Sequence, residues 1–185
     1  MKKLNKGIII SMCGIFMFSY QNISNHKQIT IEKNKIVSTL EKQVGYNYKN
    51  NDTYDGIIEI PQNNLIKGFY SKDDKRNNIN ENITVHESST YPSNDISNLI
   101  LMAHSGIGEK AYFNDLIKLN TDSLIKIYYH NIKYTYKIAF NYDIEKDGTA
   151  LIKRDKSKKT LTLITCSQKD KSKQLIYIGY LIDET

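Results

Sequence analysis

The pattern of hydrophobic and polar positions changes along this chain. Near the N-terminus, residues 7–20 form an almost continuous hydrophobic run behind three lysines. A mostly polar stretch follows, in which hydrophobic positions recur only patchily at helical spacing. From residue 54 onward, short runs rich in Ile, Leu, Tyr and Thr alternate with polar segments, which is typical of β-strands and turns. The chain therefore divides into three segments, residues 1–25, 26–53 and 54–185.

The first segment has the pattern of a secretory signal or a signal anchor, with a basic flank before a hydrophobic core. Basic residues at such a flank stay in the cytoplasm, which would place the rest of the chain outside the cell. The run at 7–20 is short for a full membrane span, but no Ala-x-Ala-like cleavage site follows it. We therefore expect an uncleaved single-pass anchor rather than a cleaved signal. The next segment, residues 26–53, is expected to be a polar stalk or linker helix.

The third segment predicts a mostly-β domain. Asn131 separates two long runs rich in Ile and Tyr and predicts a tight hairpin. One helix fits between the runs, at residues 109–119, and the strongly polar residues 71–82 are expected to form a surface loop. Many strands with few helices favour a small β-barrel or a β-sandwich. The runs that we expect to be strands are residues 56–61, 64–70, 98–104, 123–130, 132–142, 161–166 and 174–182.

Composition supports a globular domain and excludes several classes of protein. The 185 residues are enough for one domain with a core, and 39% of them are hydrophobic. The net charge of +6 is spread along the chain, which argues against nucleic-acid binding, where basic residues gather on one face. Cys13 and Cys166 are the only cysteines, and Cys13 lies inside the hydrophobic run. A disulfide framework and a Cys-rich zinc site are therefore excluded.

Cys166 and His104 are candidate catalytic residues by position alone. Cys166 ends a strand-like run and precedes a lysine-rich segment, residues 167–173, and a reactive thiolate needs such exposure and positive surroundings. His104 also ends a hydrophobic run, before a Ser-Gly-Ile-Gly loop. If the two strand ends meet at one rim of a barrel, the histidine could act on the thiol as a general acid and base. The alternatives are a buried structural cysteine and a loop histidine bonded to the backbone.

Three segments resemble, in order, the motifs of the sortase family. Residues 162–166, Thr-Leu-Ile-Thr-Cys, match the Thr-Leu-x-Thr-Cys signature of these enzymes. Residues 103–106, Ala-His-Ser-Gly, and then 111–116, Ala-Tyr-Phe-Asn-Asp-Leu, resemble the segment of the catalytic histidine and the short helix after it. Residues 56–61, Gly-Ile-Ile-Glu-Ile-Pro, resemble the first barrel strand. The resemblance covers roughly residues 54–183, and three motifs in order are a specific signal.

The resemblance implies a closed eight-stranded sortase-type β-barrel with one or two short helices, tethered outward on a bacterial cell membrane. Sortases are cysteine transpeptidases that cleave a C-terminal sorting signal, typically Leu-Pro-x-Thr-Gly, of a surface protein. They pass the acyl group to an amine of a peptidoglycan precursor or of another protein. Cys166 would be the nucleophile and His104 the acid/base, and the candidate substrate-binding residues are Thr165, Ser105 and Lys173. The pattern is most similar to the compact class A or D members.

One position departs from the family pattern. Gln174 stands where sortases usually have an arginine on the last strand, and the two arginines of the chain, Arg76 and Arg154, lie elsewhere. A glutamine amide can donate hydrogen bonds to a carbonyl oxygen, but it supplies neither a charge nor a bidentate fork. Losing one oxyanion donor typically costs about 10²- to 10³-fold in rate. Gln174 is therefore a candidate donor to the substrate oxygen, with Lys173 or a backbone N–H as alternatives.

Several functions stay open on these residues. Besides a transpeptidase, the chain could be a thiol peptidase that hydrolyses its substrate, or a degenerate surface-tethered binding module, as Gln174 suggests. No cofactor is predicted, because the acids that alternate at Asp143, Glu145 and Asp147 are more simply solvated than bound to calcium. The expected partners are surface proteins with a sorting signal, an amine acceptor, and the membrane through residues 7–20, without nucleic acid.

Overall fold

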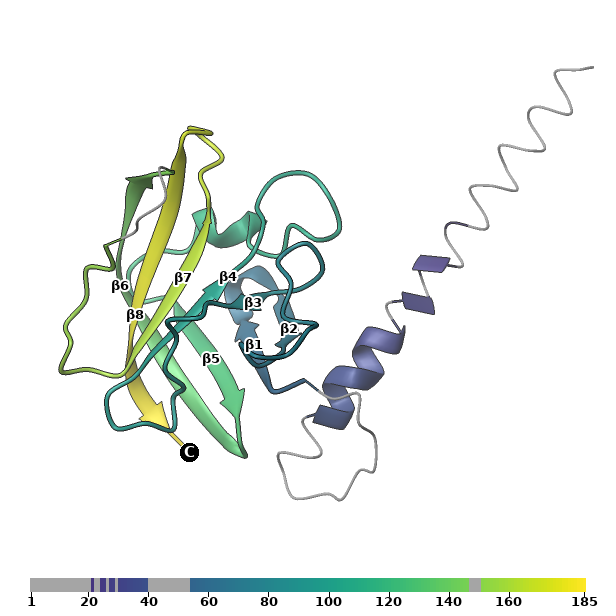
Figure 1. Ribbon diagram of the computed structural model, residues 1–185, viewed down its shortest axis with the longest axis horizontal. Coiled ribbons are helices and arrows are strands. Elements are labelled where there is room, and N and C mark those ends of the chain that lie inside the picture. Colours follow the sequence, from purple (N-terminus) through teal and green to yellow (C-terminus); the bar gives the residue numbers. More distant parts are fainter. Residues whose placement is uncertain (1–20, 22–23, 26, 29, 40–53, 147–150) are drawn as a thin grey trace, which may run out of the picture.

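The computed structural model describes residues 21, 24–25, 27–28, 30–39, 54–146 and 151–185 (Figure 1). The predicted membrane anchor at residues 7–20 lies outside these residues. Within the described part of the chain, no helix is long and hydrophobic enough to cross a membrane. Of the segment predicted as a stalk, residues 30–39 are helical.

Eight strands of the described residues form one sheet that curls into a nearly closed barrel (Figure 1). The strand order is β2-β1-β5-β6-β8-β7-β4-β3. β2 and β3 are the edge strands of this sheet. Among the described residues, an isolated β-bridge between Phe69 and Ile83 links the two edges. The expected barrel therefore has its eight strands, but it is not closed by a continuous ladder. The strands are β1 Gly56–Ile60, β2 Leu65–Phe69, β3 Thr84–Val85, β4 Asn98–Met102, β5 Leu124–Tyr129, β6 Ile132–Glu145, β7 Thr160–Cys166 and β8 Lys173–Glu184.

The hairpin between β5 and β6 confirms the prediction made from Asn131. The turn has two residues, His130 with φ 49° and Asn131 with φ 67°, and both adopt left-handed backbone conformations. Two-residue turns of this kind match the natural twist of the flanking strands. β1 ends at Ile60 because Pro61 begins the 3-10 helix η1, Pro61–Asn63.

The helix expected at residues 109–119 is wrong in its bounds and its type. The structure has only the 3-10 helix η2, Asn114–Lys118, in this segment. The residues before it are held by contacts with distant parts of the chain. The backbone N–H of Phe113 donates to the carbonyl of His104 (3.0 Å), and the Tyr112 hydroxyl donates to the carbonyl of Glu81 (3.1 Å). The Phe113 N–H is thereby used outside an α-helical ladder, in which it would donate to Glu109.

The strands bury side chains on two sides of the sheet. The main core fills the barrel and includes Leu163 and Tyr177. A second, smaller hydrophobic cluster includes Ile164, which follows Leu163 on β7, and Ile176, which precedes Tyr177 on β8. Because side chains alternate along a strand, the second cluster lies on the outer face of the same strands. Position 166, two residues after Ile164, therefore belongs to that outer face.

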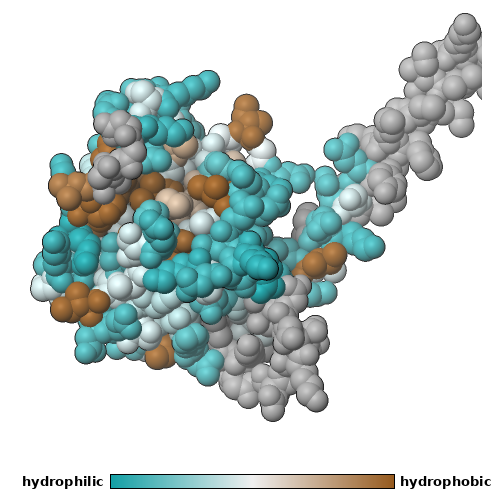
Figure 2. All heavy atoms as spheres, viewed as in Figure 1, coloured by the Kyte–Doolittle hydropathy of each residue, from teal (hydrophilic) through white to brown (hydrophobic). Residues whose placement is uncertain are grey.

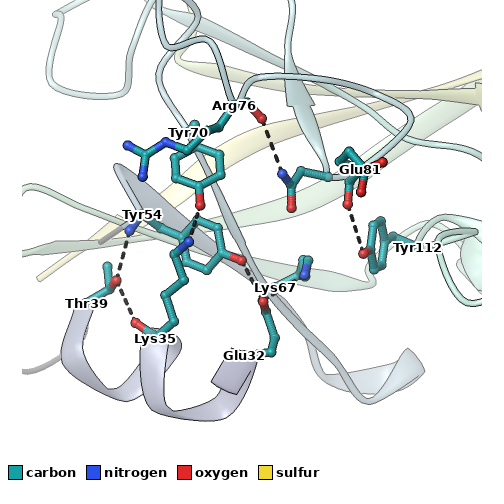
Figure 3. A network of polar contacts seen from close by, with 10 residues as sticks. Glu32, Lys35, Thr39, Tyr54, Lys67, Tyr70, Arg76, Glu81 and Tyr112 are labelled. Carbon is teal, nitrogen blue, oxygen red and sulfur yellow. Dashed lines mark hydrogen bonds and ion pairs between the residues drawn. The ribbon is translucent and has the colours of Figure 1, made fainter. Parts of the chain in front are cut away.

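The helix at residues 30–39 packs against the start of the barrel through polar contacts (Figure 3). The Glu32 carboxylate accepts a hydrogen bond from the Tyr54 hydroxyl (2.7 Å) and pairs with the Lys67 ammonium (2.8 Å). Burial and the bond to Glu32 raise the pKa of Tyr54, so this hydroxyl stays protonated and continues to donate. Glu32 thus joins the helix to β2 and to Tyr54, just before β1.

Further contacts support the same packing (Figure 3). The Lys35 ammonium donates to the Tyr70 hydroxyl, and the Thr39 hydroxyl accepts from the backbone N–H of Tyr54 (3.1 Å). The Tyr54 ring lies directly on Gly68, where a Cβ atom would be only 1.9 Å from the ring. Gly68 is therefore required by the close approach of this ring.

We expect Glu32→Ala to lower the free energy of unfolding by about 1–3 kcal/mol, because it leaves the buried Lys67 and the Tyr54 hydroxyl without their acceptor. Urea denaturation followed by circular dichroism measures this. Lys33→Ala, at an exposed position of the same helix, is the matched control and should change the value by less than about 0.5 kcal/mol. Equal stabilities of the two variants would show that the helix does not depend on Glu32.

Candidate active site

Parallel pairing of β4 with β7 brings Cys166 and His104 to one edge of the barrel. The ladder pairs Leu101 with Leu163 and Met102 with Ile164, and it extends to a hydrogen bond from the Ala103 N–H to the Ile164 carbonyl (3.3 Å). Parallel strands end at the same edge, so the next residues along each chain stay level with one another. The sequence prediction that these two strand ends meet is consistent with this arrangement.

Cys166 is partly exposed at the end of β7. Across the sheet it pairs with Gln174 of β8, which in turn pairs with Ile144 of β6. Directly paired residues point to the same face, so Gln174 lies beside the cysteine as the family pattern implies. The cation closest to the sulfur is a different residue, Lys146, whose Nζ lies 3.5 Å from Sγ.

His104 is also partly exposed, and its ring is held by a neighbouring loop. Its Nε2 lies 3.2 Å from Oδ1 of Asn80. This contact is within hydrogen-bond distance, so the Asn80 amide is a partner of the imidazole ring. Asn80 therefore helps to fix the direction of the imidazole.

The loop that carries Asn80 is attached to the segment after His104. Glu81 pairs with Lys110 at 2.5 Å, and its carbonyl accepts from the Tyr112 hydroxyl (Figure 3). These two contacts lie next to Asn80 along the chain. They explain how a residue from the long polar loop, residues 71–82, stays against the imidazole.

Asn114 connects the loop after His104 with the loop after Cys166. Its side-chain oxygen accepts from the Gly106 N–H (3.0 Å) and from the Gln168 amide (2.8 Å). Gly106 and Gly108 have φ of 120° and 138°, which glycine adopts readily and other residues do not. The two glycines therefore let the chain turn sharply after His104 and reach Asn114.

The predicted substrate-binding residues lie at this edge in different roles. The Ser105 hydroxyl donates to the Cys166 carbonyl (2.6 Å), and the buried Thr165 hydroxyl donates to the Ala103 carbonyl (2.9 Å). Both therefore join the ends of β4 and β7. Lys173 lies between two carboxylates, 4.0 Å from Glu145 and 3.9 Å from Asp170.

A pocket of about 260 Å³ opens at the end of the barrel beside Cys166. Helix η2 forms one wall, and the ends of β6, β7 and β8 form the others. Its lining is largely polar and includes Asn141 and Asp143. Burial, together with the nearby Asp143 carboxylate, raises the pKa of Tyr177, which lies in the same lining.

On its other side, Cys166 adjoins the hydrophobic outer face of the sheet. Ile100, Ile164, Ile176 and Ile178 form its buried part, and partly exposed residues pack against them. Figure 2 shows hydrophobic side chains gathered over the strands β6, β8 and β7 on the face turned to the viewer. The partly exposed members are Met102, Tyr142, Ile144, Ile152 and Tyr180. An extended peptide with hydrophobic side chains fits such a surface.

The acids considered for calcium do not gather into a metal site within the described residues. Asp143 lines the pocket, Glu145 points towards Lys173, and Asp147 lies outside the described residues. The described part of the chain contains no group of three His, Cys, Asp or Glu side chains in a metal-binding arrangement.

Sequence reasoning missed Asn80 and Lys146. Asn80 lies in a polar loop with many similar residues, and Lys146 is one lysine among many. Asn80 is identified only by the three-dimensional path of its loop, and Lys146 only by the pairing of β6 with β8. No local pattern distinguishes these two side chains from their neighbours.

Comparison with known proteins agrees with this geometry. A family model described as "Sortase domain" matches residues 58–182. No curated protein matches the chain.

Several solved structures with the same fold are sortases. The chain is similar to a Clostridium perfringens sortase D5 transpeptidase, with a TM-score of 0.65, 19% identity, and coverage of 83% of this chain and 99% of that one. It is similar to sortase C1 from Streptococcus agalactiae, with a TM-score of 0.63, 23% identity, and coverage of 78% and 75%. It is also similar to sortase A from Corynebacterium diphtheriae, with a TM-score of 0.62, 16% identity, and coverage of 89% of this chain and 96% of that one.

We expect Asn80→Ala to lower kcat for cleavage of a peptide substrate roughly 3- to 10-fold, because the imidazole loses one orienting hydrogen bond worth about 1 kcal/mol. Steady-state kinetics measures this. Asn94→Ala, at an exposed loop position, is the control and should leave kcat unchanged. An unchanged kcat in Asn80→Ala would show that the ring is oriented by other contacts.

Proposed function

The chain belongs to the sortase family of cysteine transpeptidases, and we propose that it cleaves a Leu-Pro-x-Thr-Gly-like sorting signal and transfers the acyl group to an amine. The observation that carries this proposal is the level placement of Cys166 and His104 at the ends of two parallel strands. A nucleophile and a base on adjacent rigid strand ends are what acyl transfer requires.

The proposed reaction has two covalent steps. In the first, His104 takes the proton of the Cys166 thiol, the thiolate attacks the threonine carbonyl carbon, the Thr–Gly C–N bond breaks, and His104 gives that proton to the leaving glycine amine. In the second, an acceptor amine attacks the thioester, gives a proton back to His104, and the C–S bond breaks. The product is a new amide, and the enzyme returns to its starting state.

The hydrophobic outer face supports the choice of peptide. The Leu and Pro side chains that precede the scissile bond would lie over Ile164 and Ile144, next to the sulfur. Burying such side chains contributes roughly 25 cal/mol per Å² of hydrophobic surface, and it also excludes water from the thioester. Both effects favour a sorting signal over an unstructured polar peptide.

The pocket at the barrel end supports transfer over hydrolysis. It adjoins Cys166 from the side away from the hydrophobic face, so an acceptor could approach the thioester while the peptide stays bound. The Asp143 carboxylate in its lining would attract the ammonium form of an amine acceptor. A peptidoglycan precursor or a second surface protein can supply such an amine.

We place the enzyme on the outer side of the cell membrane, in keeping with this substrate. The support for this is the basic flank and the hydrophobic run at residues 7–20 of the sequence. A single-pass anchor there would hold the catalytic domain where sorting signals emerge. The compact outline of the domain fits the class A or D type.

Mass spectrometry of residues 28–185 with a panel of sorting-signal peptides and an amine tests the proposal. We expect a thioester on Cys166 and an amide-linked product, both absent in Cys166→Ala. His104→Ala should lower the rate about 10²- to 10⁴-fold, because proton transfer to the leaving amine is lost.

The same products distinguish the alternatives. A peptide that ends in a threonine carboxylate as the main product, even with excess amine, would identify a thiol peptidase. No adduct with any peptide, together with an inert Cys166 thiol, would favour a non-catalytic binding module and contradict the proposal.

We further expect Ile144→Ala to raise KM for the sorting peptide roughly 5- to 10-fold with little change in kcat, because it removes about 1 kcal/mol of hydrophobic contact made equally in substrate and transition state. Initial-rate kinetics over a range of peptide concentrations measures this. Ile182→Ala, at an exposed position (55%) towards the other end of β8, is the control. Equal KM values for both variants would place the peptide elsewhere.

A further inference from the structure

The proposed reaction needs positive charge next to Cys166, and Gln174 cannot supply it. The sulfur is negative before attack, and the carbonyl oxygen becomes negative during it. Gln174 pairs directly with Cys166 across the β7–β8 ladder, at the place where the charge is missing. An amide in that position can donate a hydrogen bond but does not neutralise an anion.

Lys146 brings a charge to this place from the neighbouring strand. It directly follows β6, and its backbone N–H donates to the Ser172 carbonyl (2.8 Å), which fixes its Cα beside the start of β8. Its Nζ lies 3.5 Å from Sγ of Cys166. No carboxylate forms an ion pair with Lys146 among the described residues, so its ammonium is available to the sulfur.

Lys173 and the two arginines of the chain are less suited to this task. Lys173 is engaged with Glu145 and Asp170, as described above. Arg76 pairs with Asp74 (2.7 Å) in the loop between β2 and β3. Arg154 lies between residues whose N–H groups donate to the Tyr142 and Tyr180 hydroxyls.

Those two tyrosines place Arg154 along the sheet. Tyr142 is level with Ile164, through Ile176, and Tyr180 pairs with Thr160. Both levels precede Cys166 along β7. Arg154 is therefore held beside an earlier part of the strand, and Lys146 is the cation at the sulfur.

We infer that Lys146 is a catalytic residue that replaces the missing strand arginine and stabilises the negative charge on Cys166 and on the substrate oxygen. This inference rests on the proposed transpeptidase function. In the free enzyme the ammonium stabilises the thiolate. When the thiolate attacks, the new C–S bond forms and the electron pair of the carbonyl moves to its oxygen, two bonds from the sulfur. A lysine side chain is flexible enough to follow the charge over that distance, and it keeps its proton throughout.

Peptide binding strengthens this effect. Lys146 is exposed in the free chain, where water screens its charge. A peptide lying over the hydrophobic outer face would exclude water from one side of the sulfur. The attraction between the ammonium and the developing anion then increases, because the local dielectric constant falls. Lys146 therefore acts more strongly on the transition state than on the free thiolate.

The test compares variants of the full chain: Lys146→Met, Lys146→Arg, and Lys171→Met as the matched control. Lys171 is exposed in the loop between β7 and β8, so its substitution removes the same charge without touching the sulfur. We expect Lys146→Met to lower kcat about 10²- to 10³-fold with KM nearly unchanged. A loss of this size is typical when one oxyanion donor is removed. Lys146→Arg should retain activity within about tenfold, and Gln174→Arg added to Lys146→Met should restore part of the rate, because each supplies a charge at the same place.

A second readout does not depend on the peptide. Alkylation of Cys166 by iodoacetamide at neutral pH, followed by mass spectrometry of the peptide that contains it, should be several-fold slower in Lys146→Met than in Lys171→Met. If no peptide forms a thioester with the unsubstituted chain, the proposed function fails by itself, and this comparison still decides the role of Lys146. Equal kcat and alkylation rates in Lys146→Met and Lys171→Met, or a loss confined to KM, would overturn the inference.

Discussion

The parallel pairing of β4 with β7 is the constraint on which the candidate site depends. It makes two segments that are distant in sequence end at one edge, so His104 and Cys166 arrive level with one another. The antiparallel neighbours then bring the start of β8 and the end of β6 to the same edge, with Gln174 and Lys146. Each reactive group is thus supplied by a strand end whose position is fixed by the barrel core.

Much of this fold follows from local signals, and the rest does not. Hydrophobic runs predicted seven of the strands to within a few residues, and Asn131 predicted the hairpin, because alternation and turn chemistry are encoded by neighbouring residues. The two-residue strand β3 has too few positions to show a pattern. The helix at 109–119 failed for a different reason, since Phe113 bonds to His104 and not within a helix. Such contacts between distant residues leave no trace in a hydrophobic period.

The same distinction applies to the site. A motif indicated the candidate cysteine and histidine, and the family resemblance put Gln174 where an arginine is usual. What lies at the sulfur instead could not be read, because Lys146 reaches it only through the pairing of β6 with β8 and of β8 with β7. Asn80 is similar, since its contact with His104 depends on the path of a long loop. A sequence can therefore show that a group is missing before it shows which residue replaces it.

The N-terminal helix is connected to that loop by a continuous series of contacts. Glu32 pairs with Lys67, and the Lys67 ammonium lies 4.8 Å from the centre of the Tyr112 ring. The Tyr112 hydroxyl donates to the carbonyl of Glu81 (Figure 3). Glu81 follows Asn80, whose amide oxygen contacts the imidazole of His104. The described helix, residues 30–39, is therefore in contact, through Lys67 and Tyr112, with the loop that carries Asn80.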